Sequence, residues 1–243
     1  NCTFIGNTAD RFGGGLSVAA KNTIIIENSV FERNHADEFG GAIYIDSMKM
    51  SFGCTIAISG CTFNNNNCSN GCAIYISEES NRPTANNKVP IITINGNCTF
   101  NNNIEQKEYS LIMTKGTDVS ISDLSDSSKS CRAIHSDVNA VTEIENVLFR
   151  NCRVPNGEGN AIKFEESNTQ STERNPIIHN CIFENCGTSG WTVHSLSTSF
   201  TFTDNIIRDS VGGLYSVSGV IERNTFENIS PDGSGCGLTL RVT

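Results

Sequence analysis

The sequence contains little proline and few basic residues, and it has no long apolar segment. Of 243 residues, 5 are proline and 17 are lysine or arginine. The basic residues form no run and the formal net charge is -9, so the composition disfavours nucleic acid as a partner. Nothing in the sequence resembles a signal peptide, a transit peptide or a membrane span, because the apolar runs are only a few residues long.

What the chain does contain is a composition suited to turns. Apolar residues make up 37% of the chain, whereas 30 residues are asparagine and 21 are glycine. Asn, Ser and Gly weaken a helical backbone, so long helices are disfavoured. The chain opens at NCTF and closes at GLTLRVT, both inside a repeat, without the polar cap that a repeat stack needs. We therefore expect residues 1–243 to form a single repeat segment of a longer protein.

A repeat of irregular length, 19 to 37 residues, runs along the chain. Each turn has one aromatic or apolar residue, here called the anchor. The nine anchors are Phe4, Phe31, Phe63, Phe100, Leu124, Phe149, Phe183, Ile207 and Phe226. An apolar alternation ends five residues before most anchors, at Ile26, Ile58, Val119, Ile144, Ile178, Phe202 and Ile221. Asparagine follows the anchor at +3 in the early turns and at +2 in the later ones, and a Gly-rich entry such as GGAIYI leads into a third short segment.

The alternation in each segment has period two, which is typical of β-strands. Each strand type returns once per turn, so equivalent strands pair in parallel, about 4.8 Å apart. Parallel connections are right-handed as a general rule. The sequence therefore predicts an all-β, right-handed, single-stranded parallel β-helix, a solenoid of about nine coils with three parallel sheets. Ile, Val and Phe fill its interior, and Asn occupies its bends because it tolerates left-handed backbone conformations.

Two tetrapeptide patterns carry a family resemblance. FxxN occurs at Phe31–Asn34, Phe63–Asn66 and Phe100–Asn103, and GGAI occurs at Gly40–Ile43. The pair resembles the repeat of the polymorphic outer membrane proteins, which are bacterial autotransported surface adhesins; similar repeats occur in surface proteins of parasitic protists. The resemblance implies an extracellular or cell-surface passenger used in adhesion. Its partners would then be a host-cell, glycan or matrix surface.

The third segment of each turn presents a column of side chains on its outer face. If Ile43 and Ile45 point inward, the residues between and equivalent to them point outward. We predict ligand binding by six members of this column: Tyr44, Tyr75, His135, Lys163, His194 and Tyr215. Such a stripe could stack on or hydrogen-bond to an extended glycan or peptide. The alternative is an ordinary exposed sheet face, since Tyr has a high strand propensity.

The cysteines allow two readings. Cys54, Cys61, Cys68 and Cys72 have a spacing that suggests four metal ligands. Their alternation pattern instead places them on different walls of one coil, so we interpret them as buried thiols and predict no metal site and no cofactor. Cys152 and Cys186 occupy equivalent +3 positions in successive turns, which is compatible with a disulfide.

Two further groups of residues were considered as sites. Asn67 and Asn97 belong to N-x-S/T sequons near bends and are possible N-glycosylation sites in a secreted eukaryotic protein. Three acidic pairs occur at residues 37–38, 78–79 and 165–166. Glycoside hydrolysis needs two carboxylates that converge on one bond, but successive residues of an extended segment point apart. These pairs are therefore poor catalytic dyads.

These observations favour a non-enzymatic extracellular β-helix that serves as a structural stalk or an adhesin. Two alternatives stay open. The first is a polysaccharide-processing enzyme, a lyase or glycoside hydrolase, of the pectin-lyase-like fold. The second is an architectural subunit of a larger extracellular filament or assembly, whose partners are other copies or subunits, because open sheet edges can pair with further strands.

Overall fold

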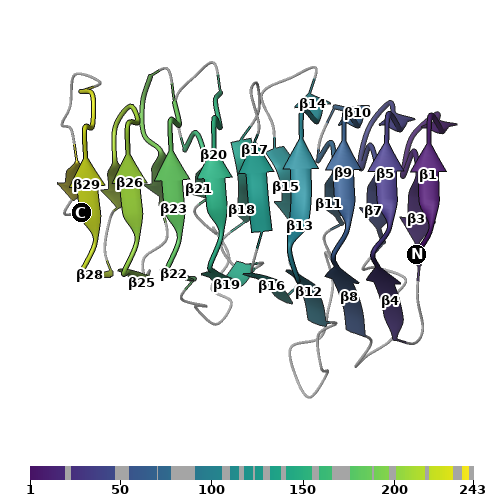
Figure 1. The fold of residues 1–243 in the computed structure, drawn as a ribbon, viewed down its shortest axis with the longest axis horizontal. Coiled ribbons are helices and arrows are strands. Elements are labelled where there is room, and N and C mark those ends of the chain that lie inside the picture. Colours follow the sequence, from purple (N-terminus) through teal and green to yellow (C-terminus); the bar gives the residue numbers. More distant parts are fainter. Residues whose placement is uncertain are drawn as a thin grey trace.

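The structure, a computed structural model, is a rod of stacked coils whose two termini lie at opposite ends (Figure 1). It describes residues 1–19, 23–46, 55–69, 71–77, 91–105, 110–114, 118–122, 124–127, 132–137, 141–154, 159–165, 176–187, 189–196, 201–216, 219–231 and 237–240. All named strands pair in parallel, in three long sheets and one short one. The described residues contain no helix long and apolar enough to cross a membrane.

Each long sheet contains one kind of segment from the repeat. Sheet I consists of β4 (Ile24–Glu27), β8 (Thr55–Ser59), β12 (Ile91–Asn95), β16 (Asp118–Ser122), β19 (Val141–Glu145), β22 (Ile177–His179), β25 (Thr201–Thr203) and β28 (Val220–Glu222). Sheet II, which holds the anchors, consists of β1 (Thr3–Ile5), β5 (Val30–Glu32), β9 (Thr62–Asn64), β13 (Cys98–Asn101), β17 (Leu124–Ser127), β20 (Leu148–Arg150), β23 (Ile182–Glu184), β26 (Ile206–Arg208) and β29 (Thr225–Glu227).

Sheet III follows the Gly-rich entries. It consists of β3 (Leu16–Val18), β7 (Ile43–Ile45), β11 (Ile74–Ile76), β15 (Ser110–Thr114), β18 (Arg132–Asp137), β21 (Ile162–Glu165), β24 (Val193–Ser195), β27 (Leu214–Ser216) and β30 (Leu238–Leu240). The short sheet consists of β2 (Thr8–Ala9), β6 (His35–Ala36), β10 (Asn67–Cys68) and β14 (Ile104–Glu105). The predicted right-handed parallel β-helix of about nine coils and three sheets is confirmed, and the short sheet is an addition in the first four coils.

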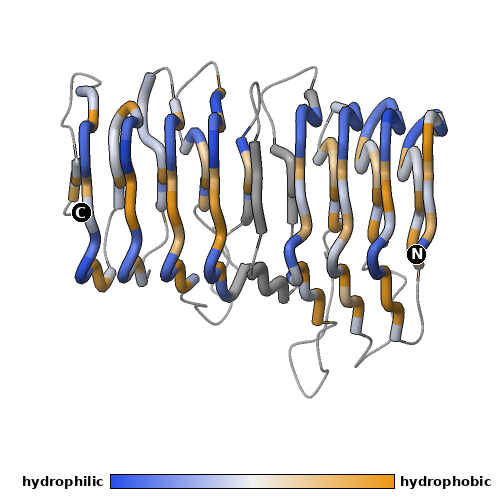
Figure 2. Tube along the Cα trace, viewed as in Figure 1, coloured by the Kyte–Doolittle hydropathy of each residue, from blue (hydrophilic) through white to orange (hydrophobic). Residues whose placement is uncertain are grey.

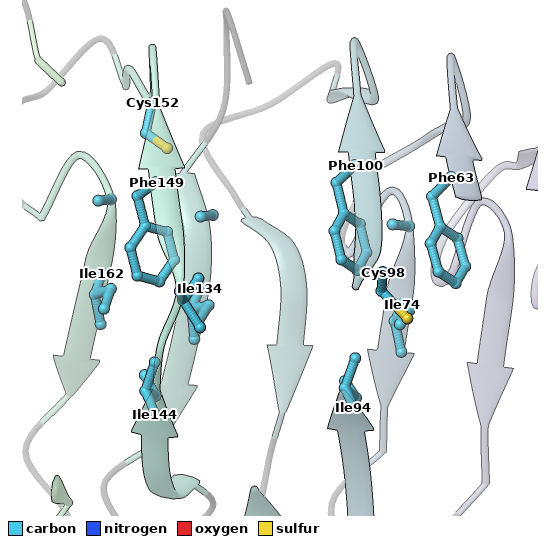
Figure 3. Close-up of a cluster of buried hydrophobic side chains, with 14 of the residues drawn as sticks. Phe63, Ile74, Ile94, Cys98, Phe100, Ile134, Ile144, Phe149, Cys152 and Ile162 are labelled. Carbon is cyan, nitrogen blue, oxygen red and sulfur yellow. The ribbon is translucent and has the colours of Figure 1, made fainter. Parts of the chain in front are cut away.

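The interior consists of stacked aromatic and β-branched side chains. Phe31, Phe63 and Phe100 are at most 1% exposed, and their ring centroids lie 5.1 and 4.8 Å apart along the rod. Figure 3 shows Phe63 and Phe100 side by side in this interior, with Ile74 and Ile94 from the other two sheets nearby. In Figure 2 orange and blue stretches alternate along the coloured coils, as expected for strands with one face buried.

The anchor predicted in the fifth coil is wrong by two residues. Leu124 pairs with Cys98, whereas Asp126 aligns with both Phe100 and Phe149. In sheet I the same slip places Ile121 rather than Val119 in register with Ile94, beside a β-bulge between Val119 and Ser120. A shift of two residues keeps every side chain on its predicted face, so the hydrophobic pattern alone could not detect it.

In most of the described coils, the bends on either side of the anchor strand each hold one residue with positive φ, and a glycine with positive φ stands at a third bend before several strands of sheet III. Three residues before the anchors stand Asn28, Gly60, Asn97, Asn146, Asn180, Asp204 and Arg223, with φ from 47° to 63°. Two residues after the anchors stand Arg33, Asn65, Asn102, Asn151, Asn185, Asp209 and Asn228, with φ from 49° to 59°. Asn is frequent in both sets because its short polar side chain tolerates the left-handed region. The predicted role of Asn at the bends is therefore confirmed for the +2 position.

Asparagine at +3 has a different role, which the sequence pattern did not separate from the first. Asn34, Asn66 and Asn103 are at most 1% exposed and form a ladder along the rod. Asn34 Nδ2 donates to Asn66 Oδ1 at 3.0 Å, and Asn66 Nδ2 donates to Asn103 Oδ1 at 2.8 Å. Each amide also donates to a backbone carbonyl of the preceding coil, at 3.0 Å. This ladder supplies hydrogen bonds to backbone groups that have no access to water.

Candidate binding surface

The predicted outward column of sheet III is in register, one residue per coil. Its order is Ser17, Tyr44, Tyr75, Met113, His135, Lys163, His194, Tyr215 and Thr239. Met113 therefore stands in the fourth coil, between Tyr75 and His135 in register. Ile43, Ile45, Ile74 and Ile76, on either side of the first two tyrosines, are fully buried in the core. The structure thus brings all six predicted ligand-binding residues onto one sheet face.

Three of the six predicted ligand-binding residues are much less exposed than residues on an ordinary outer sheet face. Tyr75, His135 and His194 are only 7%, 7% and 8% exposed, so the interpretation of an open stripe is wrong at these positions. Tyr44, Lys163 and Tyr215 are partly exposed. Among the contacts that cover the column, the ring of Phe39 lies 4.4 Å from Tyr75, and the ring of Tyr215 lies 4.7 Å from His194.

A cluster of four aromatic rings forms the N-terminal part of this surface. We call Phe12, Phe39, Tyr44 and Tyr75 the outer aromatic cluster. Phe12 stacks on Tyr44 with ring centroids 4.7 Å apart, and Tyr44 stacks on Tyr75 at 5.8 Å. Phe12 and Phe39 stack on each other at 5.8 Å and form an isolated parallel bridge between successive coils. Three of the four rings stay partly exposed, so the cluster offers a flat apolar surface that reaches solvent.

Charged side chains lie at the edge of this cluster. Arg11 Nε is 2.8 Å from Glu38 Oε1, and the guanidinium lies 4.5 Å from the centroid of the Phe12 ring. Sequence reasoning missed Phe12 and Phe39. The available signal was that RFGG and EFGG precede the third segment in successive turns, which places each aromatic and its charged neighbour in register.

The C-terminal part of the surface has a second, smaller aromatic group. The Trp191 ring lies 5.6 Å from that of Tyr215; Trp191 and His194 belong to one coil, and Tyr215 belongs to the next. Lys163 stands between His135 and His194 in register. The described part of the column therefore combines aromatic, imidazole and ammonium groups.

The cysteines serve the walls of the coil. Cys61, Cys68 and Cys72 are at most 1% exposed and belong to different parts of one coil, and Cys54 lies outside the described residues. Cys61 Sγ donates to the carbonyls of Ile26 and Ser59 at 3.4 and 3.3 Å. The Cys61 thiol thus donates to a backbone carbonyl at its bend. The Ser29 hydroxyl makes the equivalent contact in the preceding coil, where it donates to the carbonyl of Glu27.

Cys152 and Cys186 continue the +3 column in which the first coils carry Asn. Both are buried thiols in the structure, and Cys186 N–H donates to Ser210 Oγ at 3.0 Å. The disulfide between them stays a prediction. Burial, together with the nearby Glu145 carboxylate, raises the pKa of a third buried thiol, Cys181, to about 12.

The two glycosylation candidates differ in access. Asn97 is exposed at a bend with φ 63°. Asn67 is half-buried in β10, and its Oδ1 is buried and has no hydrogen-bond partner among the described residues. A glycan on either side chain stays a prediction, and Asn97 is the more accessible acceptor.

The acidic pair that can be described does not form a dyad. Asp37 Oδ1 is 2.9 Å from His35 Nε2, whereas Glu38 pairs with Arg11. Residues 78, 79 and 166 of the other pairs lie outside the described residues. A different group, Glu143, Glu145 and His179, places three potential ligand atoms within 4.8 Å of one another, and sequence reasoning missed it.

Comparisons with protein families agree with this architecture. The family described as the right handed beta helix region matches residues 57–230. The Chlamydia polymorphic membrane protein repeat matches residues 1–19 and 28–46, the first two coils. No curated protein and no solved structure matches the chain significantly.

Proposed function

This chain belongs to the right-handed β-helix family, and on that premise we propose that it is a non-enzymatic protein of the cell surface or extracellular space that acts as a stiff stalk or adhesin. The observation that carries the proposal is the match of its first two coils to the polymorphic membrane protein repeat. The same two coils supply Phe12, Phe39 and Tyr44 of the outer aromatic cluster.

Stiffness follows from the way the coils are held together. Sheets II and III run unbroken through nine strands each, so every coil is hydrogen-bonded to its neighbours. The Asn ladder adds side-chain hydrogen bonds along the same direction in the first coils. A rod of this kind holds its outer side chains at fixed spacings, which suits repeated contacts with an extended partner.

The outer aromatic cluster is the surface we propose for that contact. Partly exposed aromatic rings provide a flat apolar area, and a tyrosine hydroxyl adds a hydrogen-bonding group at its edge. The Arg11–Glu38 pair places polar groups beside the rings. This combination suits an extended glycan on a host cell or in a matrix, with the more C-terminal, partly exposed Lys163 and Tyr215 extending the same face.

The proposal is tested by the binding of the purified chain to cells and to a glycan array. The double variant Phe12→Ala and Tyr44→Ala removes two partly exposed rings, so we expect binding to fall at least about tenfold. Ile25→Ala is the matched control, because Ile25 is a 62% exposed apolar side chain on sheet I. We expect this control to bind like the parent chain.

Two results would contradict the proposal. Equal binding by the double variant and the parent would exclude the outer aromatic cluster as the contact surface. Release of reducing ends or unsaturated products from a polysaccharide panel would favour the carbohydrate-enzyme alternative instead.

A further inference from the structure

Three potential metal ligands meet on the outer face of sheet I, away from the outer aromatic cluster. Glu143 and Glu145 lie two residues apart on β19, so both point outward, while Ile144 between them is fully buried. His179 on β22 is the register partner of Glu145. The ligand atoms of the three side chains all lie within 4.8 Å of one another, and all three residues are partly exposed.

The spacing within this group fits a bound ion. His179 Nε2 lies 3.2 Å from Glu143 Oε1. Two ligands of a tetrahedral Zn²⁺, each at about 2.1 Å from the metal, lie about 3.4 Å apart. The His179–Glu143 edge therefore already has about the length required, and the Glu145 carboxylate lies within 4.8 Å of both other ligand atoms.

The charge of the group also favours a cation. With a neutral imidazole the group carries two negative charges. Among the described residues, neither glutamate is paired with a lysine or arginine. Arg223, which follows β28 of the same sheet, already forms a two-point pair with Asp204 at 2.7 and 2.8 Å. A divalent cation would balance both carboxylates at once.

The imidazole ring has a partner on its other side. The Asn180 side-chain amide lies 3.5 Å from His179 Nδ1. An amide nitrogen donates, so Nδ1 is the acceptor of this contact. A metal at Nε2 requires the other tautomer, in which Nδ1–H donates, and the Asn180 amide would then have to turn its oxygen toward the ring.

We propose that Glu143, Glu145 and His179 form a binding site for a divalent transition metal, with Zn²⁺ as its best occupant. One imidazole nitrogen and two carboxylate oxygens suit Zn²⁺, whereas Ca²⁺ and Mg²⁺ prefer all-oxygen ligand sets. The ion would link two successive coils through β19 and β22. This inference is independent of the proposed adhesive function.

The test is a calorimetric titration of the chelator-treated 243-residue chain with ZnCl₂ at pH 7.4. We expect one saturable site, and we expect Ca²⁺ not to compete for it. His179→Gln and Glu143→Gln should each weaken Zn²⁺ binding at least about tenfold.

His35→Gln is the matched control. His35 makes the same kind of contact with one carboxylate, Asp37, at 2.9 Å, but it belongs to no group of three among the described residues. X-ray absorption spectroscopy at the zinc edge adds an independent readout, because the chain has 11 cysteines that could also bind zinc. A thiolate ligand would give a Zn–S distance near 2.3 Å, whereas an imidazole or carboxylate ligand gives about 2.0 to 2.1 Å. A sulfur shell, or equal affinities of the His179→Gln and His35→Gln variants, would overturn the proposal.

Discussion

The buried asparagine ladder gives the sharpest prediction about stability. Asn66 is fully buried in the third coil, and its side chain makes four hydrogen bonds. Nδ2 donates to Phe31 O and to Asn103 Oδ1, at 3.0 and 2.8 Å. Oδ1 accepts from the backbone N–H and from Nδ2 of Asn34, both at 3.0 Å. The substitution Asn66→Ala removes all four.

The loss is partly compensated by contacts that remain. Asn34 Nδ2 still donates to Phe4 O, and Asn103 Oδ1 still accepts from the backbone N–H of residue 66. The Asn34 backbone N–H, however, loses its side-chain acceptor in a place without water. An unsatisfied buried amide costs about 1 to 3 kcal/mol, and the other lost bonds about 0.5 to 1.5 kcal/mol each. We therefore expect Asn66→Ala to lower the free energy of unfolding by at least about 2.5 kcal/mol.

Urea unfolding followed by circular dichroism measures this change in the free energy of unfolding. Two further variants, at residues 65 and 66, provide reference values for it. Asn65→Gly changes an exposed residue with φ 54°, where glycine is tolerated, so we expect a change of no more than about 0.5 kcal/mol. Asn66→Cys introduces the residue that stands at the same position in later coils, so its cost should be intermediate. A loss for Asn66→Ala no larger than that for Asn65→Gly would refute the assignment of the ladder as a stabilising element.

Three other predictions concern the thiols, the glycines and the core. Alkylation of the native chain at pH 8 should label exposed Cys2 before Cys181, because burial raises the pKa of Cys181 to about 12; labelling of Cys181 before Cys2 in peptide mass spectra would contradict its burial. Gly41→Ala should lower the thermal unfolding midpoint more than Gly237→Ala, because an added Cβ would lie 2.4 Å from a carbonyl oxygen at Gly41 but 3.4 Å from its nearest neighbour at Gly237; equal midpoints would exclude this clash. Phe149→Ala should cost about 3 to 5 kcal/mol in urea unfolding, because the ring is 1% exposed and stacks on that of the next coil; a cost below about 1 kcal/mol would show that the ring does not pack in the core.

The fold could be predicted because inward residues repeat in every coil. Each strand has one buried face, so Ile, Val and Phe return with period two and mark the strands independently of loop length. The prediction failed at Leu124, where Asp126 takes the anchor position in the register. A polar residue at an anchor position carries no hydrophobic signal, and the two-residue slip preserved the in–out pattern. Only the pairing with neighbouring strands fixes the register there.

The candidate sites were less predictable, because they depend on contacts between coils. The order of the outer column followed from strand alternation alone and is present in the structure. Its burial did not follow, because the covering ring of Phe39 comes from a loop before the strand. Glu143 and Glu145 are separated from His179 by more than 30 residues in sequence. The group is recognised only when the register pairs Glu145 with His179.

The division between inner and outer columns explains where function can reside in this rod. Inner positions are fixed by stacking and by ladders, so a new side chain there disturbs the neighbouring coils as well as its own. Outer positions are held at the same regular spacing but face fewer constraints, and they can therefore carry binding groups without loss of the fold. The outer aromatic cluster lies in the first three coils on sheet III, and the proposed metal site lies on sheet I between β19 and β22. Because they share no residue and no strand, loss of one by substitution should leave the other intact, and each can be tested against the same folded scaffold.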